Sequence, residues 1–168
     1  MSHLAFIAVD VSEGGALFAD RGDTEACTLV RGVESAFESA VKAEQGTELP
    51  GPLGSFVAAF SSPLRAVRAA LKLRDAAGDA PVRVGIHGGQ CLALTRDERI
   101  EYFGETLHRA VWLGQAAQAG EIVLSQGVAD DADVARALAS DGAEASVPNA
   151  TARPYAGRRG VTLARGAA

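Results

Sequence analysis

An apolar run near the N-terminus limits the possible folds more than any other part of this sequence. It extends from Leu4 to Val11 and is interrupted only by Asp10 and by small alanines. A strand that protein covers on both faces is hydrophobic along its length, whereas a strand with one wet face alternates between polar and apolar residues. We therefore expect a central strand here, in a sheet with both faces covered, ending at a carboxylate.

Strand and helix patterns alternate along the rest of the chain. Val82, Val84 and Ile86 recur at every second position, as in a half-buried strand. Ser62 followed by Pro63 is a typical helix start, because serine caps the first turn and proline fits its first position. In chain order, the expected elements are a strand over 4–11, a helix from 23 or 24 to 45, a hairpin over 47–60, a helix over 63–77, a strand over 82–94, a helix over 104–119, a strand over 121–125, a helix over 128–139 and a terminal hairpin over 155–164. Residues 95–99 and 140–154 are expected to be loops.

This order of elements predicts the fold class. It begins β-α-β-β-α-β around one sheet, which is the arrangement of an α+β sandwich of the ferredoxin-like kind. The length of 168 residues is within the usual size of one domain. We therefore predict a single domain over residues 1–168, built on a ferredoxin-like βαββαβ core sheet with helices.

Charge and cysteine content argue against several classes of function. The net charge of −5 gives no long-range attraction to nucleic acid or anionic lipid, because both need a cationic surface. No apolar run approaches the ~20 residues that cross a bilayer, and the N-terminus has no export-signal pattern. Cys27 and Cys91 lack the spacing of a disulfide framework or a zinc site. We predict a cytoplasmic protein that binds neither nucleic acid nor a membrane.

Three blocks of sequence occur at compatible spacing. They are R-V-G-I-H-G-G at 83–89, Y-F-G-E-T-L-H-R-A at 102–110 and G-E-I-V-L-S at 120–125. Together they resemble the R-V-G-I-H-x-G, Y-F-G-x-x-V-N-x-A-A-R-L and G-E-I-x-x-S blocks of the class III adenylate/guanylate cyclase catalytic domain. Residues 6–11 resemble the first strand of that family, which carries a metal-binding aspartate. The resemblance covers nearly the whole chain and is weakest over 141–153.

The resemblance implies a metal site that has lost one of its ligands. In that family two aspartates hold two divalent cations, Mg²⁺ or Mn²⁺, which activate the ribose hydroxyl and clamp the triphosphate. The first aspartate corresponds to Asp10, and the second corresponds to Gly54, whose side chain has no ligand atom. Asp10 has a second interpretation, as a strand-end carboxylate that caps a neighbouring helix or turn.

The positions that bind the nucleotide in this family have changed as well. Pro50 corresponds to the lysine that reads the base in the family, and Glu101 to the second base-reading residue. His108 corresponds to the asparagine of the family, and Trp112 to its arginine. The asparagine and arginine lie one helical turn apart on the partner subunit, where they orient the ribose and stabilise developing charge. Of these four positions only Glu101 keeps a hydrogen-bond acceptor of the expected kind, so we treat all four as vestigial substrate-site positions.

Other polar and aromatic residues have two interpretations each. His108 and Trp112 can form a stacking site for a planar ligand or part of a dimer interface, and aromatic enrichment at interfaces favours the second. His87 lies in an alternating strand, where a structural role is expected. Arg158 or Arg159 matches loosely the phosphate-contacting cation of the family, and a solvated edge hairpin is the alternative.

These losses predict a catalytically inactive cyclase-homology domain, a pseudoenzyme that acts in cytoplasmic signalling by binding. Its partner is expected to be a second copy in a homodimer, another cyclase-homology protein, or a nucleotide or other small ligand in the remodelled cleft between protomers. No catalytic residue and no cofactor is expected, because neither half of the shared site is complete. The alternative is a nucleotidyl cyclase whose rearranged site uses Asp10, Glu101 and His108 with divalent Mg or Mn to convert a nucleoside triphosphate to a cyclic nucleotide.

Overall fold

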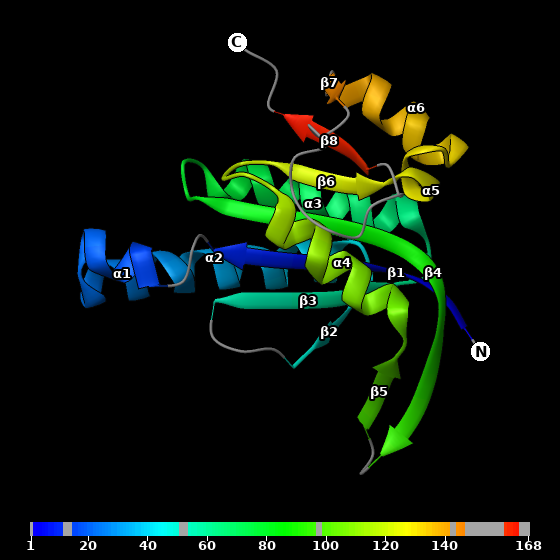
Figure 1. Ribbon diagram of the computed structural model, residues 1–168, viewed down its shortest axis with the longest axis horizontal. Coiled ribbons are helices and arrows are strands. Elements are labelled where there is room, and N and C mark those ends of the chain that lie inside the picture. The colour runs from blue at the N-terminus through cyan, green and yellow to red at the C-terminus, as the bar shows by residue number, and fades with distance from the viewer. Residues whose placement is uncertain are drawn as a thin grey trace.

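The computed structural model describes residues 2–11, 15–50, 54–96, 99–141, 144–146 and 160–164. The strands are β1 (Ser2–Val11), β2 (Thr47–Leu49), β3 (Ser55–Phe60), β4 (Val82–Arg96), β5 (Arg99–Phe103), β6 (Ile122–Ser125), β7 (Glu144–Ser146) and β8 (Gly160–Ala164). The helices are α1 (Gly15–Arg21), α2 (Asp23–Ala43), α3 (Pro63–Ala77), α4 (Glu105–Ala116), α5 (Gln126–Ala129) and α6 (Ala132–Asp141) (Figure 1).

The described strands form one mixed sheet. Its path is β2-β3-β1-β4-β6-β8-β7, and β5 pairs with β4 outside this path. The first four strands of the path are antiparallel to their neighbours, whereas β4 and β6 run parallel. With α2 and α3 as its two helices, the unit β1-α2-β2-β3-α3-β4 has the ferredoxin-like order, so the predicted α+β fold with a βαββαβ core is confirmed.

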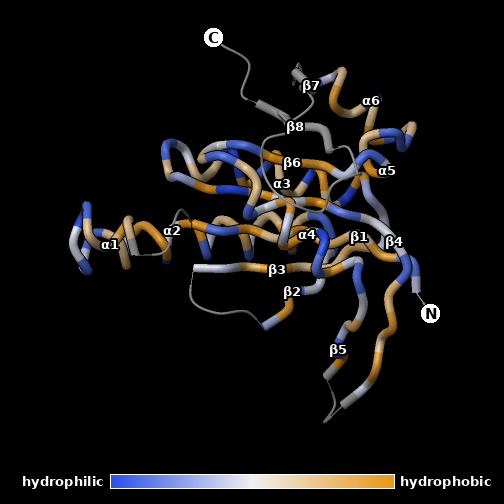
Figure 2. Tube along the Cα trace, in the orientation of Figure 1, coloured by the Kyte–Doolittle hydropathy of each residue, from blue (hydrophilic) through white to orange (hydrophobic). Residues whose placement is uncertain are grey.

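Protein covers β1 on both faces, as its apolar run predicted. Ala5, Ile7 and Val9 belong to the larger hydrophobic core, which the inward faces of α2 and α3 complete. Phe6 and Ala8 point to the opposite face, where they pack in a smaller cluster that includes Ala110 of α4. Figure 2 shows the hydrophobic stretches of β1 and β3 side by side at the centre of the molecule.

Two glycines allow α4 to lie directly against the sheet. A Cβ atom on Gly85 of β4 would lie 2.1 Å from the backbone nitrogen of Gly114 and 2.2 Å from the carbonyl oxygen of Ala110. A Cβ atom on Gly114 would lie 3.1 Å from the carbonyl oxygen of Ala8 in β1. Backbone therefore packs on backbone at this crossing, and the contact fixes the position of every side chain that α4 carries.

The start of α3 confirms the prediction made from Ser62 and Pro63. The Ser62 side chain accepts a hydrogen bond from the backbone nitrogen of Arg65 at 3.4 Å, and Pro63 is the first helical residue. The helix α2 begins at Asp23, one of the two expected first residues, and Gly22 is its N-cap residue. A glycine cap supplies no side-chain acceptor to the first amides of α2.

Position 46 requires glycine because a side chain there would clash with its neighbours, and not because of its backbone angle. The residue that adopts the left-handed conformation after α2 is Gln45, with a φ of 57°. A Cβ atom on Gly46 would lie 2.5 Å from the ring of Phe60, a core residue of β3. The turn between α2 and β2 therefore sits on this ring, and that contact sets where β2 begins.

The region around β5 differs most from the sequence-based expectation. Residues 95–99 were expected to be a loop, but β4 continues to Arg96 and β5 begins at Arg99. The two strands pair from Leu92 opposite Phe103 to Arg96 opposite Arg99, and form a ribbon that leaves the body of the molecule (Figure 1). We call this ribbon, residues 92–96 and 99–103, the arm.

The C-terminal elements differ as well. The helix expected over 128–139 is divided into α5 and α6, because Asp131 caps α6 by accepting hydrogen bonds from the backbone nitrogens of Asp133 and Val134. The expected loop 140–154 contains the short strand β7, and α1 forms at 15–21, where no element was expected. Of the expected terminal hairpin, β8 pairs with β6 and β7, and residues 155–159 lie outside the described residues. No helix in the described ranges is long and apolar enough to span a membrane.

The glycine contact beneath α4 gives a stability prediction. Gly85→Ala places a methyl group where backbone atoms of α4 already lie, so we expect a loss of about 3 kcal/mol or more in the free energy of unfolding. Gly32→Ala in α2 is the matched control, because its Cβ would meet no atom within 4 Å. We expect this control to gain about 0.5–1 kcal/mol through its higher helix propensity. Urea unfolding followed by circular dichroism measures both changes, and a Gly85→Ala protein as stable as the wild type would contradict the packing described.

Candidate active site

The candidate site begins with a row of three residues across three strands. Asp10 near the end of β1 lies opposite Ser55 at the start of β3 and opposite Arg83 near the start of β4. Directly paired residues in an antiparallel sheet point to the same face. Asp10 follows Phe6 and Ala8 in the alternation of β1, so this row faces the side of the sheet on which α4 packs.

Asp10 forms an ion pair with Arg83. The Nη2 atom of Arg83 donates to the Oδ2 atom of Asp10, with 16 % of the Arg83 side chain and 29 % of the Asp10 side chain exposed. The Nε atom of Arg83 is buried and has no hydrogen-bond partner among the described residues. Asp10 therefore does not stand alone, because the guanidinium group of Arg83 already opposes its charge.

Gly54 supplies backbone and no side chain to this site. Its carbonyl oxygen accepts a hydrogen bond from the backbone nitrogen of Val11 at 3.0 Å, which fixes it beside the end of β1. It adopts a φ of +82°, and a Cβ atom built on it would meet no atom within 4 Å. The described residues contain no group of three or more His, Cys, Asp or Glu side chains arranged to hold a metal ion. The residues present therefore do not fit the two-cation site that the resemblance implied.

Pro50 lies in an acidic setting at the end of β2. Glu48, two residues earlier, has a pKa raised above its ordinary value of 4.5, first by partial burial of the carboxyl group and then by repulsion from Glu38 and Glu34. Lys72, one of the chain's two lysines, pairs with Glu44 at 2.6 Å from its position in α3. The strand end that carries a lysine in the family thus has no ammonium group here and an excess of negative charge.

Glu101 belongs to the arm and lies opposite Leu94. Arg83 pairs with Asp10 at one end of β4 and Leu94 lies near the other end, separated by roughly 35 Å of strand. Asp10 and Glu101 of one chain therefore lie at opposite ends of β4. A single copy of this chain cannot bring the two carboxylates together, which matters for any reaction assigned to them.

His108 and Trp112 lie one turn apart on α4 but in different surroundings. His108 is exposed, whereas Trp112 is half-buried and packs against the cluster of Leu113, Ala117 and Val123. Trp112 thus covers the edge of α4 over β6, which is a structural role that an arginine at the same position would not fill. His87 is half-buried in β4, and the structural role expected for it stays a prediction. Arg158 and Arg159 lie outside the described residues.

Sequence reasoning missed two features of this region. The pairing of Asp10 with Arg83 depends on the register of β1 against β4, which no single sequence segment contains. The hydrophobic face of the arm was missed because residues 95–99 were interpreted as a loop. The alternation of Leu92 and Leu94 with Ala93 and Thr95 was the available signal, since it has the period of a strand with one distinct face.

The fold is that of the catalytic domains of class III nucleotidyl cyclases. An adenylate cyclase from Trypanosoma brucei, solved in its monomeric state, superimposes with a TM-score of 0.79 at 16 % identity, over 97 % of this chain and 89 % of that chain. An adenylate/guanylate cyclase/hydrolase from Silicibacter pomeroyi gives 0.73 at 18 % identity, over 97 % and 96 %. A dimeric guanylyl cyclase domain of the RhoGC fusion protein from Blastocladiella emersonii gives 0.73 at 11 % identity, over 96 % and 93 %.

At these identities the likeness establishes the fold alone. A scan of protein-family models finds no match to this sequence, and neither does a search of curated proteins. The resemblance inferred from the three sequence blocks is therefore confirmed at the level of the fold, and the activity has to be argued from the residues of the site.

The ion pair gives a prediction for the site itself. Asp10→Asn leaves the largely buried guanidinium of Arg83 without its anion, so we expect a loss of about 1–3 kcal/mol in the free energy of unfolding. Asp133→Asn is the matched control, because it also removes an aspartate paired with an arginine but at a site where Arg136 is 78 % exposed. We expect the control to cost at most about 0.5 kcal/mol. Urea unfolding separates the two cases, and equal losses would mean that Asp10 contributes no more than a surface pair.

Proposed function

We propose that this chain is a catalytically inactive cyclase-homology domain, which acts in the cytoplasm by associating with a second copy of itself. One observation carries the loss of activity: glycine occupies position 54, where cyclase chemistry needs the second metal-binding carboxylate. A two-cation mechanism needs carboxylates close to both ions, because their negative charge must offset the repulsion between the two cations. Here the single remaining carboxylate, Asp10, is already paired with Arg83.

The second half of the site supports the same conclusion. In a symmetric dimer each composite site draws its metal ligands from one chain and its nucleotide ligands from the other, so one sequence must supply both sets. Pro50 offers no cation, and Trp112 is committed to packing over Val123. Each lost metal or charge-stabilising contact typically contributes several kcal/mol to lowering the reaction barrier, so their combined loss should abolish useful turnover.

Restoring the missing carboxylate tests this explanation. Gly54→Asp adds an acid into open space, at a positive φ that aspartate and asparagine tolerate better than most residues. We expect Mn²⁺ to bind this variant about tenfold more tightly than it binds the wild type. Gly54→Asn is the control, because it has the same backbone cost without the added charge. Isothermal titration calorimetry with MnCl₂ gives the affinities, and tight binding of two Mn²⁺ ions to the wild type would refute the proposal.

A turnover assay decides between this proposal and a rearranged enzyme. Wild-type protein is incubated with each nucleoside triphosphate and Mg²⁺ or Mn²⁺, and we expect neither cyclic nucleotide nor pyrophosphate above the background. Clear turnover that Asp10→Ala abolishes, in a variant whose folding is verified by circular dichroism, would establish a cyclase with an altered site instead. Because Asp10 and Glu101 lie at opposite ends of β4, such an enzyme would have to assemble its site from two chains.

The arm supports association with a second copy. Leu92, Leu94 and Phe103 share one face of the arm with Glu101 and are 46 %, 47 % and 48 % exposed, whereas Ile100, 53 % exposed, lies on the other face opposite Thr95. A two-stranded ribbon is marginally stable in water, and exposed apolar side chains gathered on one face mark an interaction surface. Figure 2 shows hydrophobic residues along the part of β4 that leaves the body of the molecule. A second copy presents the same surface and can cover it in a closed symmetric pair.

A charge placed on this face tests the association. We expect the wild type to sediment as a concentration-dependent dimer, and Leu94→Glu to weaken dimerisation at least about tenfold by burying an unpaired carboxylate. Thr95→Glu is the matched control on the neighbouring residue, whose side chain points to the other face of the arm. Analytical ultracentrifugation measures both. A wild type that stays monomeric at about 100 μM, or equal effects of the two variants, would contradict the assignment of this face.

A further inference from the structure

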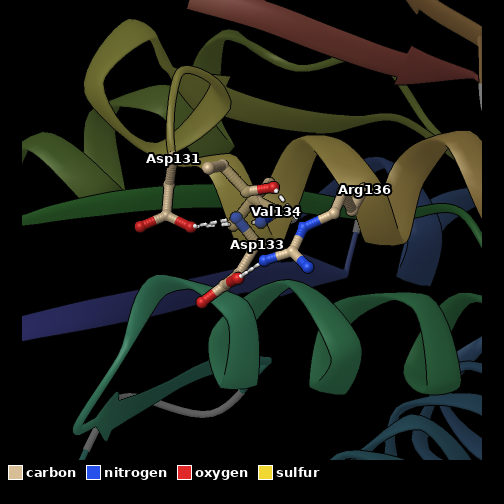
Figure 3. Close-up of polar contacts among 5 residues, drawn as sticks. Asp131, Asp133, Val134 and Arg136 are labelled. Atoms are coloured by element: carbon tan, nitrogen blue, oxygen red, sulfur yellow. Dashed lines mark hydrogen bonds and ion pairs between the residues drawn. The ribbon is translucent and has the colours of Figure 1, made fainter.

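A groove lies between α3 and α6, on the side of the molecule away from α4 and the arm. It is open to solvent, has a volume of about 500 Å³, and is lined by Leu64, Arg68 and Leu71 of α3 and by Asp133, Arg136 and Ala137 of α6. Figure 3 shows the first turn of α6 above the ribbon of α3, with Asp133 and Arg136 paired on this turn. Asp131 fixes the turn by accepting hydrogen bonds from the backbone nitrogens of Asp133 and Val134, at 3.0 and 3.1 Å.

The charged side chains around this groove are paired with one another, with one exception. Asp133 is paired with Arg136 three residues along the same helix. Asp141, at the end of α6, accepts from Arg74 at 3.2 Å. Arg68 lies at the centre of the α3 wall, exposed, and the described residues give it neither an ion pair nor a hydrogen bond. The two acids are therefore satisfied, and a single guanidinium group remains available to an anion.

The apolar lining sits beside this cation. Leu64 and Leu71 lie four residues before and three residues after Arg68, so all three project from the same side of α3. Ala137 faces them from α6 and, being small, leaves the space between the two helices open. The volume is within the range of small-molecule sites, which are mostly apolar and contain a few polar groups that fix the ligand's orientation.

We propose that this groove binds a small organic acid with one negative charge and an apolar chain. Its carboxylate pairs with Arg68, whose planar guanidinium group fits a carboxylate through two parallel hydrogen bonds. Its chain lies on Leu64, Leu71 and Ala137. A second negative charge on the ligand is disfavoured because it finds no second cation to pair with: Arg136 is paired with Asp133, and Arg74 with Asp75 and Asp141. The site is separate from the candidate active site at Asp10 and does not depend on dimerisation through the arm.

Octanoate is the probe for this site. Two other eight-carbon compounds test how much its single negative charge contributes to binding. 1-Octanol keeps the chain and removes the charge, and suberate keeps the chain and adds a second carboxylate. Methyl groups of the full chain are followed by NMR during titration. We expect octanoate to bind saturably in the millimolar range and to shift the methyl resonances of Leu64, Leu71 and Ala137. Both comparison compounds should bind several-fold more weakly.

Arg68→Gln tests the cation directly, and Arg31→Gln is the matched control. Both arginines are exposed and helical, but Arg31 lies in α2 and does not line the groove. We expect Arg68→Gln to weaken octanoate binding about fivefold and to abolish the preference for octanoate over 1-octanol, with little change in Arg31→Gln. Equal weakening in both variants, shifts confined to the arm or α4, or no saturable binding at about 10 mM octanoate would overturn the proposal.

Discussion

β1 is paired with β3 on one side and with β4 on the other, and the position of every other part of the site depends on this arrangement. The pairing places Asp10 between Ser55 and Arg83, with no freedom to slide, since a shift of one residue would move Phe6 and Ala8 from one face of the sheet to the other. Both faces are buried, so such a shift would expose core residues on each side. The register that stabilises the fold therefore also sets which groups can meet at the end of β1.

This constraint explains why the fold does not depend on the side chains at positions 50 and 54. The contacts that hold the sheet together are backbone hydrogen bonds, the hydrophobic core and the close approach of α4 over Gly85, and none of them uses the side chain at position 54 or 50. An acid at position 54 would point into open space, so its absence leaves no cavity in the core and no unsatisfied partner. The ion pair of Asp10 with Arg83 keeps the remaining carboxylate satisfied. Glycine at position 54 thus costs the structure little.

The sequence predicted those parts of the fold that local chemistry determines. The hairpin of β2 and β3, the cap at Ser62 and the buried face of α2 follow from short patterns in which each residue type has one suitable position. The missed features depend on distant segments. β5 contains two charged residues and two aromatic residues in five positions, which is not a recognisable strand pattern in the sequence. It is identified as a strand only by its pairing with β4. The pairing of Asp10 with Arg83 joins residues 73 positions apart and becomes visible only through the sheet register.

The position of β4 in the sheet also explains why the arm is fixed at its base and exposed at its outer end. The first part of β4 lies between β1 and β6 in the sheet, and only its continuation beyond Cys91 forms the arm with β5. Tyr102 anchors the base of the arm, since its ring meets that of Phe6 edge to face at 5.7 Å between centroids. Beyond this contact Leu94 and Ile100 remain about half exposed. The arm is thus held firmly where it joins the core, while its apolar outer part is left uncovered. A surface that is both positioned and uncovered loses little conformational entropy when a second chain packs on it, so the arm favours association more than a mobile loop of the same composition would.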